Sequence, residues 1–236
     1  CIRDRAERLG KKADADRYRR QLEATTKAYI EKFVSKKGIV AKDYQSAYIM
    51  ALKFVLPEGE LRELVKKNFA ANIRKNGLQT GFFATEHLLP LLVEAGETEL
   101  AYDILLQEGC PGWMYQIKCG ATTTWERWDA LKPDGTVNEE KMAGSGDNMV
   151  SFNHYAFGSV GEFYYQYILG IKPQKPGFAE LHFEPYPDRR LGGVSGSYLS
   201  RAGKIESSWK YEEDGCHISL NTPCLLYTSD AADEGL

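Results

Sequence analysis

Residues 120–129 read GATTTWERWD, and this stretch decides how the rest of the chain is interpreted. It places two carboxylates, Glu126 and Asp129, close to two indoles, Trp125 and Trp128, directly after a Gly-Ala break. Indole rings offer broad apolar faces, and carboxylates supply acid–base chemistry. The combination is therefore typical of a site that binds and cleaves sugars.

A second block lies downstream, where residues 151–158 read SFNHYAFG. The two blocks resemble the most specific motifs of bacterial α-L-rhamnosidases, glycoside hydrolase family 78, and the resemblance extends from about Ala6 to Thr222. The first block is similar to the family's general-base segment, and the second to the block that follows it. The resemblance implies the later helices of an (α/α)6 six-hairpin barrel, followed by the start of a C-terminal β-domain.

The resemblance also implies roles for single residues. Glu126 falls on the general base, which deprotonates a water in an inverting hydrolysis. His154 falls on a residue that donates a hydrogen bond to a rhamnose hydroxyl or to the carboxylate of the base. Further substrate contacts are expected from Trp125, Arg127, Trp128 and Asp129.

Structural interpretations of the same motif remain open. Thr123 and Glu126 have the spacing of a capping box, and a carboxylate at a helix N-terminus stays ionised, as a base requires. Trp125 and Trp128 would share one face of a helix, where core packing is the default role of tryptophan and sugar stacking is plausible for one of them.

The polar residues of the two blocks have alternatives as well. Arg127 and Asp129 form either an ion pair that orients the loop or two solvated residues of a first helical turn. For His154 the alternative is an imidazole satisfied by the backbone where a helix begins. That helix is expected to run to Leu169.

The first half of the chain shows the period of amphipathic helices, with apolar residues every three or four positions. The expected helices cover residues 14–37, 44–56, 60–75, 85–94 and 97–108. Pro90 is compatible with its helix only in the first turn, because proline has no amide donor. Short loops require antiparallel neighbours, which fits a bundle, a solenoid or an (α/α) barrel.

The pattern changes after the Pro/Gly-rich residues 170–177, which indicate a domain boundary. Alternating strands are expected at residues 179–184, 205–211 and 217–220, the last two joined by a hairpin turn at Glu213-Asp214-Gly215. We therefore predict a mainly α protein with three parts. These are a partial six-hairpin glycosidase domain at 1–172, an incomplete antiparallel β-sandwich domain at 173–223, and a tail at 224–236 that resembles translated sequencing adapter and is expected to lie outside the fold.

The composition of the 236 residues, 43% hydrophobic and 27% charged, is that of a soluble globular protein. A net charge of −3 gives no reason to expect nucleic acid or an anionic membrane as partner. The five cysteines show no metal-ligand spacing, so no metal or other cofactor is expected. The sequence does not determine the oligomeric state. It also does not determine whether the protein is located in the bacterial cytoplasm or in the periplasm.

The implied function is release of terminal α-L-rhamnose from a glycoside or polysaccharide by inversion. No segment before Thr122 resembles the family's acid-carrying segment, so we expect the general acid to lie upstream and the chain alone to be inactive. Two alternatives remain. One is a six-hairpin glycosidase for uronic acid or glucose, and the other is a non-enzymatic helical-array protein that binds carbohydrate.

Overall fold

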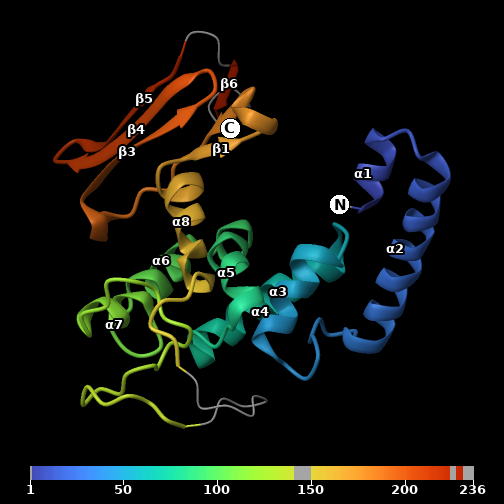
Figure 1. Ribbon diagram of the computed structural model, residues 1–236, viewed down its shortest axis with the longest axis horizontal. Helices are drawn as coiled ribbons and strands as arrows, with labels where there is room; N and C mark the ends of the chain where they lie inside the picture. The colour runs from blue at the N-terminus through green and yellow to red at the C-terminus, as the bar shows by residue number, and fades with distance from the viewer. Residues whose placement is uncertain (1, 141–149, 224–226, 231–236) are drawn as a thin grey trace. The chain divides into compact units, whose positions relative to one another are not determined.

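The computed structural model describes residues 2–140, 150–223 and 227–230. The chain divides into two compact units, residues 1–96 and residues 97–236, which are described separately (Figure 1). Within the described residues, no helix combines the length and the apolar character needed to cross a membrane.

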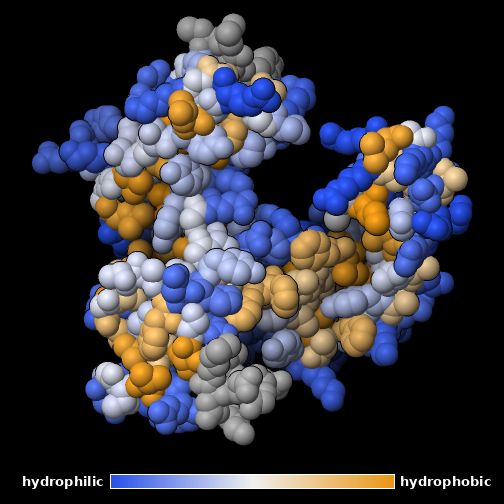
Figure 2. Space-filling model, viewed as in Figure 1, coloured by the Kyte–Doolittle hydropathy of each residue, from blue (hydrophilic) through white to orange (hydrophobic). Residues whose placement is uncertain are grey.

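Among the described residues of the first unit, the regular elements are all helices. Its elements are α1 (Ile2–Arg8), α2 (Lys12–Phe33), α3 (Gln45–Phe54), α4 (Glu60–Asn76) and α5 (Phe82–Glu94). α1 packs along α2, and α3 packs against both α4 and α5 (Figure 1). Most of α2 presents a hydrophilic surface in the view of Figure 2. The core gathers around α3, with Tyr48, Leu52, Val65, Phe69 and Leu88 all at most 1% exposed.

The first expected helix differs most from its prediction. It begins two residues earlier, as α2 at Lys12, and ends at Phe33 rather than at residue 37. The separate helix α1, which precedes it, was not predicted. Residues 35–38 instead form a turn, closed by the hydrogen bond from the Gly38 amide to the Ser35 carbonyl (2.9 Å). The turn brings Val34 beside Val40 as an isolated β-bridge.

Pro90 corrects a second expectation, because it is the ninth residue of α5 rather than part of its first turn. A proline in a helix interior costs about 3 kcal/mol, since it lacks the amide that would donate to the residue four positions earlier. The helix persists because its leucines are buried, each contributing about 1.5–3 kcal/mol. Those at most 2% exposed are Leu88, Leu89, Leu91 and Leu92.

The second unit begins with helices. They are α6 (Thr98–Leu106), α7 (Trp113–Lys118) and a continuous helical segment made of the 3-10 helix η1 (Ala156–Ser159), α8 (Val160–Phe163) and the π-helix η2 (Tyr164–Ile168). The helix expected from His154 therefore begins two residues later and changes its hydrogen-bonding pattern twice.

Two three-stranded sheets follow. One has the order β1-β2-β6, from β1 (Ile171–Pro173), β2 (Glu180–Phe183) and β6 (Tyr227–Asp230). The other has the order β3-β4-β5, from β3 (Gly193–Ser200), β4 (Gly203–Glu212) and β5 (Gly215–Asn221). The predicted hairpin is confirmed, with Glu212 opposite Gly215 across a two-residue turn. The sequence pattern missed β1 and β3.

β6 contradicts the expectation that residues 224–236 lie outside the fold. Residues 227–230 pair with β2, and this pairing is parallel, whereas all the other strand pairs are antiparallel as predicted. A strand joins a sheet edge through its backbone N–H and C=O groups. Residues 227–230 can therefore pair with β2 although apolar and polar residues do not alternate in them. The rest of this tail lies outside the described residues.

The sheet β3-β4-β5 is anchored to the end of the helical segment. The Trp209 indole donates to the Ile168 carbonyl and the Ser207 hydroxyl donates to the Leu169 carbonyl, both at 2.6 Å. Gly170 follows with φ +73°, and a side chain there would collide with the backbone of Pro185. Both sheets share a small core, formed by Leu169, Ile171, Leu181 and Ile205.

Candidate active site

The motif at residues 120–129 forms a loop after α7, with no helix or strand. The capping-box interpretation is therefore wrong, and Trp125 and Trp128 do not share a helical face. The Thr123 hydroxyl donates to the Phe152 carbonyl (2.5 Å) instead of capping a helix. The reason is that a distant segment supplies the hydrogen-bond partners that a first helical turn would have supplied.

That distant segment is the second sequence block, which lies beside the first. The Glu126 amide donates to the Ser151 carbonyl (2.8 Å), and the Ser151 amide donates to Oε2 of Glu126 (2.9 Å). The His154 amide donates to the Thr124 carbonyl (2.9 Å), and the Thr124 hydroxyl donates to the His154 carbonyl (2.6 Å). The structure thus brings Glu126 and His154 onto two adjoining stretches of backbone.

The Glu126 side chain is half-buried, and its carboxylate has a backbone amide as partner. This amide takes the place of the helix N-terminus that the sequence pattern had suggested. A carboxylate held by a backbone donor has a fixed orientation, which a general base needs in order to meet a water at a defined point.

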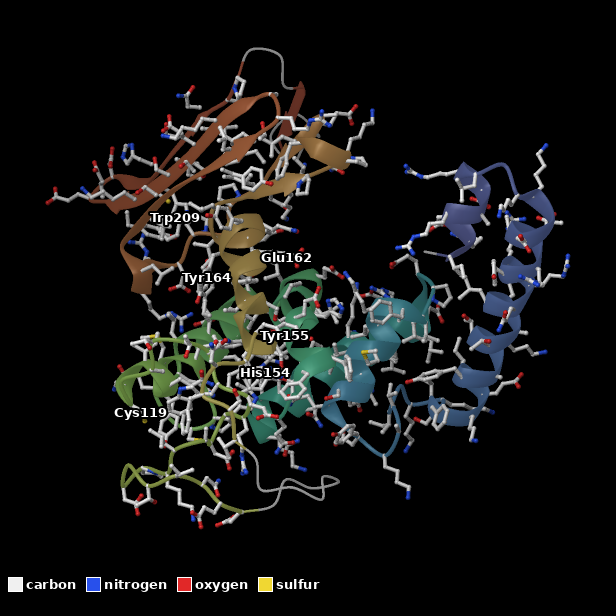
Figure 3. All side chains as sticks on the ribbon, in the orientation of Figure 1. Cys119, His154, Tyr155, Glu162, Tyr164 and Trp209 are labelled. Carbon is white, nitrogen blue, oxygen red and sulfur yellow. The ribbon has the colours of Figure 1, made fainter. Side chains whose placement is uncertain are left out.

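His154 lies just before η1, next to the exposed Tyr155 (Figure 3). The two rings stack, with centroids 5.2 Å apart. Nδ1 of His154 accepts a hydrogen bond from the Ala156 amide (3.3 Å), so in this tautomer Nε2 carries the ring proton. The imidazole therefore meets the backbone, as one interpretation had it, and a contact between His154 and substrate stays a prediction.

Both indoles of the motif are packed in aromatic clusters. Trp125, 2% exposed, meets the edges of Tyr115 and Phe152, with centroids 6.5 and 5.4 Å away. Trp128, 9% exposed, stacks flat on Phe157 at 3.7 Å. This burial favours the packing interpretation, and the role of either indole in substrate binding stays a prediction.

Trp113 completes the second cluster. Its ring meets Trp128 edge to face at 4.9 Å, and its indole donates to the Phe157 carbonyl (2.9 Å). α7, the motif loop and η1 are therefore joined through three aromatic side chains. Trp113 therefore has a packing role.

The predicted ion pair between Arg127 and Asp129 is confirmed. Nε and Nη2 of Arg127 donate to the two carboxylate oxygens of Asp129 at 2.8 and 3.0 Å, a fork that fits a carboxylate well. The hydrogen bonds from Arg127 hold the pKa of Asp129 below its ordinary value, against the effect of partial burial. The Asn138 amide also donates to Asp129 (2.7 Å), and Arg127 donates to the Glu140 carbonyl (2.7 Å). The pair thus ties the motif to the loop that follows it.

Sequence reasoning missed Thr124 and Ser151, which hold the two blocks together. A threonine or serine has no intrinsic preference for a partner 25 or 30 residues away. The only local signal was the run of three threonines before Trp125, because such residues often bond to backbone groups outside regular structure.

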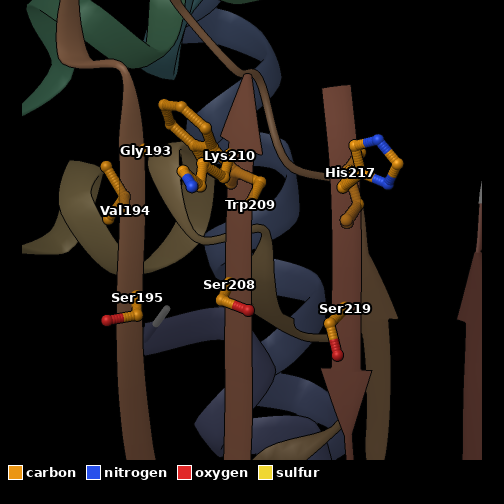
Figure 4. A pocket seen from close by; sticks show the side chains of 9 residues that line it. Gly193, Val194, Ser195, Ser208, Trp209, Lys210, His217 and Ser219 are labelled. Atoms are coloured by element: carbon orange, nitrogen blue, oxygen red, sulfur yellow. The ribbon is translucent and has the colours of Figure 1, made fainter. Parts of the chain in front are cut away.

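The described residues also form a shallow cavity of about 410 Å³ on the open face of β3-β4-β5 (Figure 4). Ser195, Ser208 and Ser219 lie opposite one another in its lining, and none of the predicted site residues takes part. At the β4–β5 turn, Glu212, Asp214 and His217 are close enough to share a cation, but all three are exposed. We assign no metal to them.

Helical hairpins joined to a C-terminal β-domain, with an acidic, Trp-rich loop beside a His block, define the class of six-hairpin glycosidases. The family profiles agree. That of the bacterial alpha-L-rhamnosidase 6 hairpin glycosidase domain matches residues 2–168, and that of the bacterial alpha-L-rhamnosidase C-terminal domain matches residues 170–224. The chain belongs to the bacterial α-L-rhamnosidase family.

Similar proteins include the alpha-L-rhamnosidases of Alteromonas sp. (strain LOR) and Streptomyces avermitilis. Both are 36% identical, over 91% and 92% of this chain. Among solved structures, the S. avermitilis enzyme complexed with L-rhamnose superposes with a TM-score of 0.86 at 34% identity, over 97% of this chain and 22% of the other. The Aspergillus terreus enzyme gives 0.87 at 29% identity, over 97% and 26%. The chain spans only 23% and 20% of the lengths of the Alteromonas and Streptomyces relatives.

Proposed function

We propose that this chain supplies the general base and part of the sugar site of an enzyme that hydrolyses terminal α-L-rhamnosyl residues of glycosides or polysaccharides. The observation that carries the proposal is the position of the Glu126 carboxylate. The Ser151 amide holds this carboxylate where the two sequence blocks meet, and His154 lies on the neighbouring stretch of backbone.

In the proposed reaction, Glu126 accepts a proton from a water molecule. The water oxygen bonds to the anomeric carbon while the glycosidic C–O bond breaks on the opposite face. A second carboxyl group, about 6.5–9.5 Å from the first, protonates the departing oxygen. We assign that acid to no residue of this chain, and we propose that the chain by itself does not turn over rhamnosides with poor leaving groups.

The neighbouring residues fit roles in sugar binding. Nε2–H of His154 is suited to donate to a sugar hydroxyl. The Arg127–Asp129 pair fixes a carboxylate that accepts from hydroxyls. The two indoles hold the loop that carries Glu126, and we propose that an edge of one of them borders the sugar.

We also propose that the helical domain ends near residue 172 and that a β-domain occupies residues 173–223. The change of family profile between residues 168 and 170 supports this division. The two compact units, which divide at residue 96, describe packing rather than these domains.

The test is Glu126→Gln in the full-length protein that contains this chain. The amide cannot accept a proton from water, so kcat should fall by roughly 10²–10⁴, the usual contribution of a general base. Affinity for L-rhamnose, measured by calorimetry, should change little. Glu162→Gln is the matched control, because Glu162 is exposed on α8 outside both blocks. A kcat for Glu126→Gln within tenfold of wild type would remove Glu126 from the mechanism.

The stereochemistry is tested separately by proton NMR during the first minutes of hydrolysis. Inversion releases β-L-rhamnose first, before mutarotation mixes the anomers. Early appearance of the α-anomer would mean retention, and Glu126 could then be no general base of the kind proposed.

A further inference from the structure

Gln116 lies in α7 and is 2% exposed, yet it holds the active-site loop at two points. Its side-chain Oε1 accepts the hydrogen bond of the Trp125 amide (3.2 Å), and its backbone carbonyl accepts that of the Ala121 amide (3.0 Å). One buried residue therefore fixes both ends of the loop that precedes Glu126.

The nitrogen of the Gln116 side-chain amide, Nε2, is buried and lacks a hydrogen-bond partner among the described residues. Leaving such a donor unpaired inside the protein is unfavourable, because the donor has lost its hydrogen bonds to water. A methionine of similar size would fill the same space without bringing an unpaired side-chain donor. Packing alone therefore does not account for a glutamine here, whereas an acceptor for the Trp125 amide does.

The bond acts next to the predicted base. Gln116 accepts from the backbone amide of Trp125, and the next residue, Glu126, has its carboxylate held by the Ser151 amide. Without Oε1, the Trp125 amide is a buried donor with no acceptor, so the backbone there must shift to find one. A shift of about 1 Å at a catalytic group is enough to reduce turnover about 10²-fold.

We propose that Gln116 is a positioning residue that sets the place of the Glu126 carboxylate through the Trp125 backbone. This inference rests on the proposed function of Glu126 as general base. It assigns Gln116 no contact with substrate, so its loss acts on turnover and leaves substrate affinity nearly unchanged.

The experiment compares Gln116→Met with Gln116→Glu in the full-length protein. Methionine fills the space but offers no acceptor, and kcat should fall about 10–100-fold while KM changes less than about threefold. Glutamate keeps an oxygen at the same reach. That oxygen can accept from the Trp125 amide whether the carboxyl group is ionised or neutral, so Gln116→Glu should restore most of kcat.

A second readout does not depend on activity. Hydrogen exchange, followed by mass spectrometry on a peptide covering residues 120–128, should become at least tenfold faster at Trp125 in Gln116→Met and stay near wild type in Gln116→Glu. Gln166→Met is the control, because the Gln166 side chain donates to the exposed Glu162 side chain on the same helical segment, outside both sequence blocks. It should alter neither kcat nor this exchange.

The outcomes separate the two proposals. An inactive wild-type protein would refute the proposed function, while the exchange rates would still decide whether Gln116 holds the loop. Unchanged exchange and unchanged kcat in Gln116→Met would overturn the positioning role. So would a fall in kcat that merely follows the folded fraction, with no rescue by Gln116→Glu.

Discussion

The motif loop at residues 120–129 and the sheet β3-β4-β5 are fixed in different ways. In the sheet, side chains alternate along β4. Ile205, Ser207 and Trp209 are at most 2% exposed, and the residues between them face outward. In the loop, no period exists, and Thr123, Thr124 and Glu126 are held by partners from elsewhere in the chain.

The difference shows where function can be placed. A strand offers a side chain only at every second position, on a face set by register. A loop held by cross-chain hydrogen bonds and stacked rings can set a carboxylate at any angle, but the angle then depends on each of those contacts. The same kind of substitution should therefore have different consequences in the two regions.

Substituting one buried tryptophan in each region tests this difference, and these substitutions should have the largest effects on stability. Trp128→Ala in the loop and Trp209→Ala in the sheet should each lower the free energy of unfolding by about 3–5 kcal/mol, measured by urea denaturation of the full-length protein. Only Trp128→Ala should also lower kcat per folded molecule, because Trp128 holds the loop of Glu126 by stacking on Phe157.

Trp128→Phe and Trp209→Phe serve as milder variants in case either alanine variant does not fold. Phenylalanine at 128 can still stack on Phe157, so it should restore most of kcat. Equal loss of kcat per folded molecule in the two alanine variants would contradict the contrast between loop and sheet.

These two regions also differ in what the sequence could predict. The β4–β5 hairpin was predicted with its turn, because alternation and a turn motif are local signals. For the motif loop, a helix start was one open interpretation, because Thr123 and Glu126 have a capping spacing and nothing local revealed the approach of Ser151. The identity of the site residues came from resemblance, and their geometry came only from the structure.

The same reasoning explains the other differences. β6 shows no alternation, and an edge strand needs none. Pro90 broke a local rule inside α5, where burial of the surrounding leucines outweighed it. The π-helix Tyr164–Ile168 continues a predicted helix in a different pattern. For β6 and Pro90, contacts outside any short window of sequence decided the outcome.

Ser207 and Ser208 test the alternation itself, with an intermediate effect. Ser207 is 2% exposed and donates to the Leu169 carbonyl, whereas its neighbour Ser208 lies on the open face shown in Figure 4. Ser207→Ala should cost about 1–2 kcal/mol of unfolding free energy, since it leaves that carbonyl without its donor. Ser208→Ala should stay within about 0.5 kcal/mol of wild type. Similar losses in both variants would mean that the register of β4 is wrong.

The smallest expected effect is the pH dependence of the Arg127–Asp129 pair. Arg127 holds the pKa of Asp129 below its unfolded value, which is about 3.9. The pair therefore contributes its full stability above about pH 4, and that contribution is lost as the pH falls through the lowered folded pKa. Because the Asp129 side chain is 45% exposed, solvent screening keeps the contribution below about 1 kcal/mol.

The difference in unfolding free energy between wild type and Asp129→Asn should be constant from pH 5 to 7 and should shrink below pH 4. Arg127→Lys should show a smaller difference of the same form, because lysine keeps the charge but loses the two parallel hydrogen bonds. A wild-type advantage that persists unchanged to pH 2.5 would mean that Asp129 stabilises the loop by shape and hydrogen bonding alone, with no share from its charge.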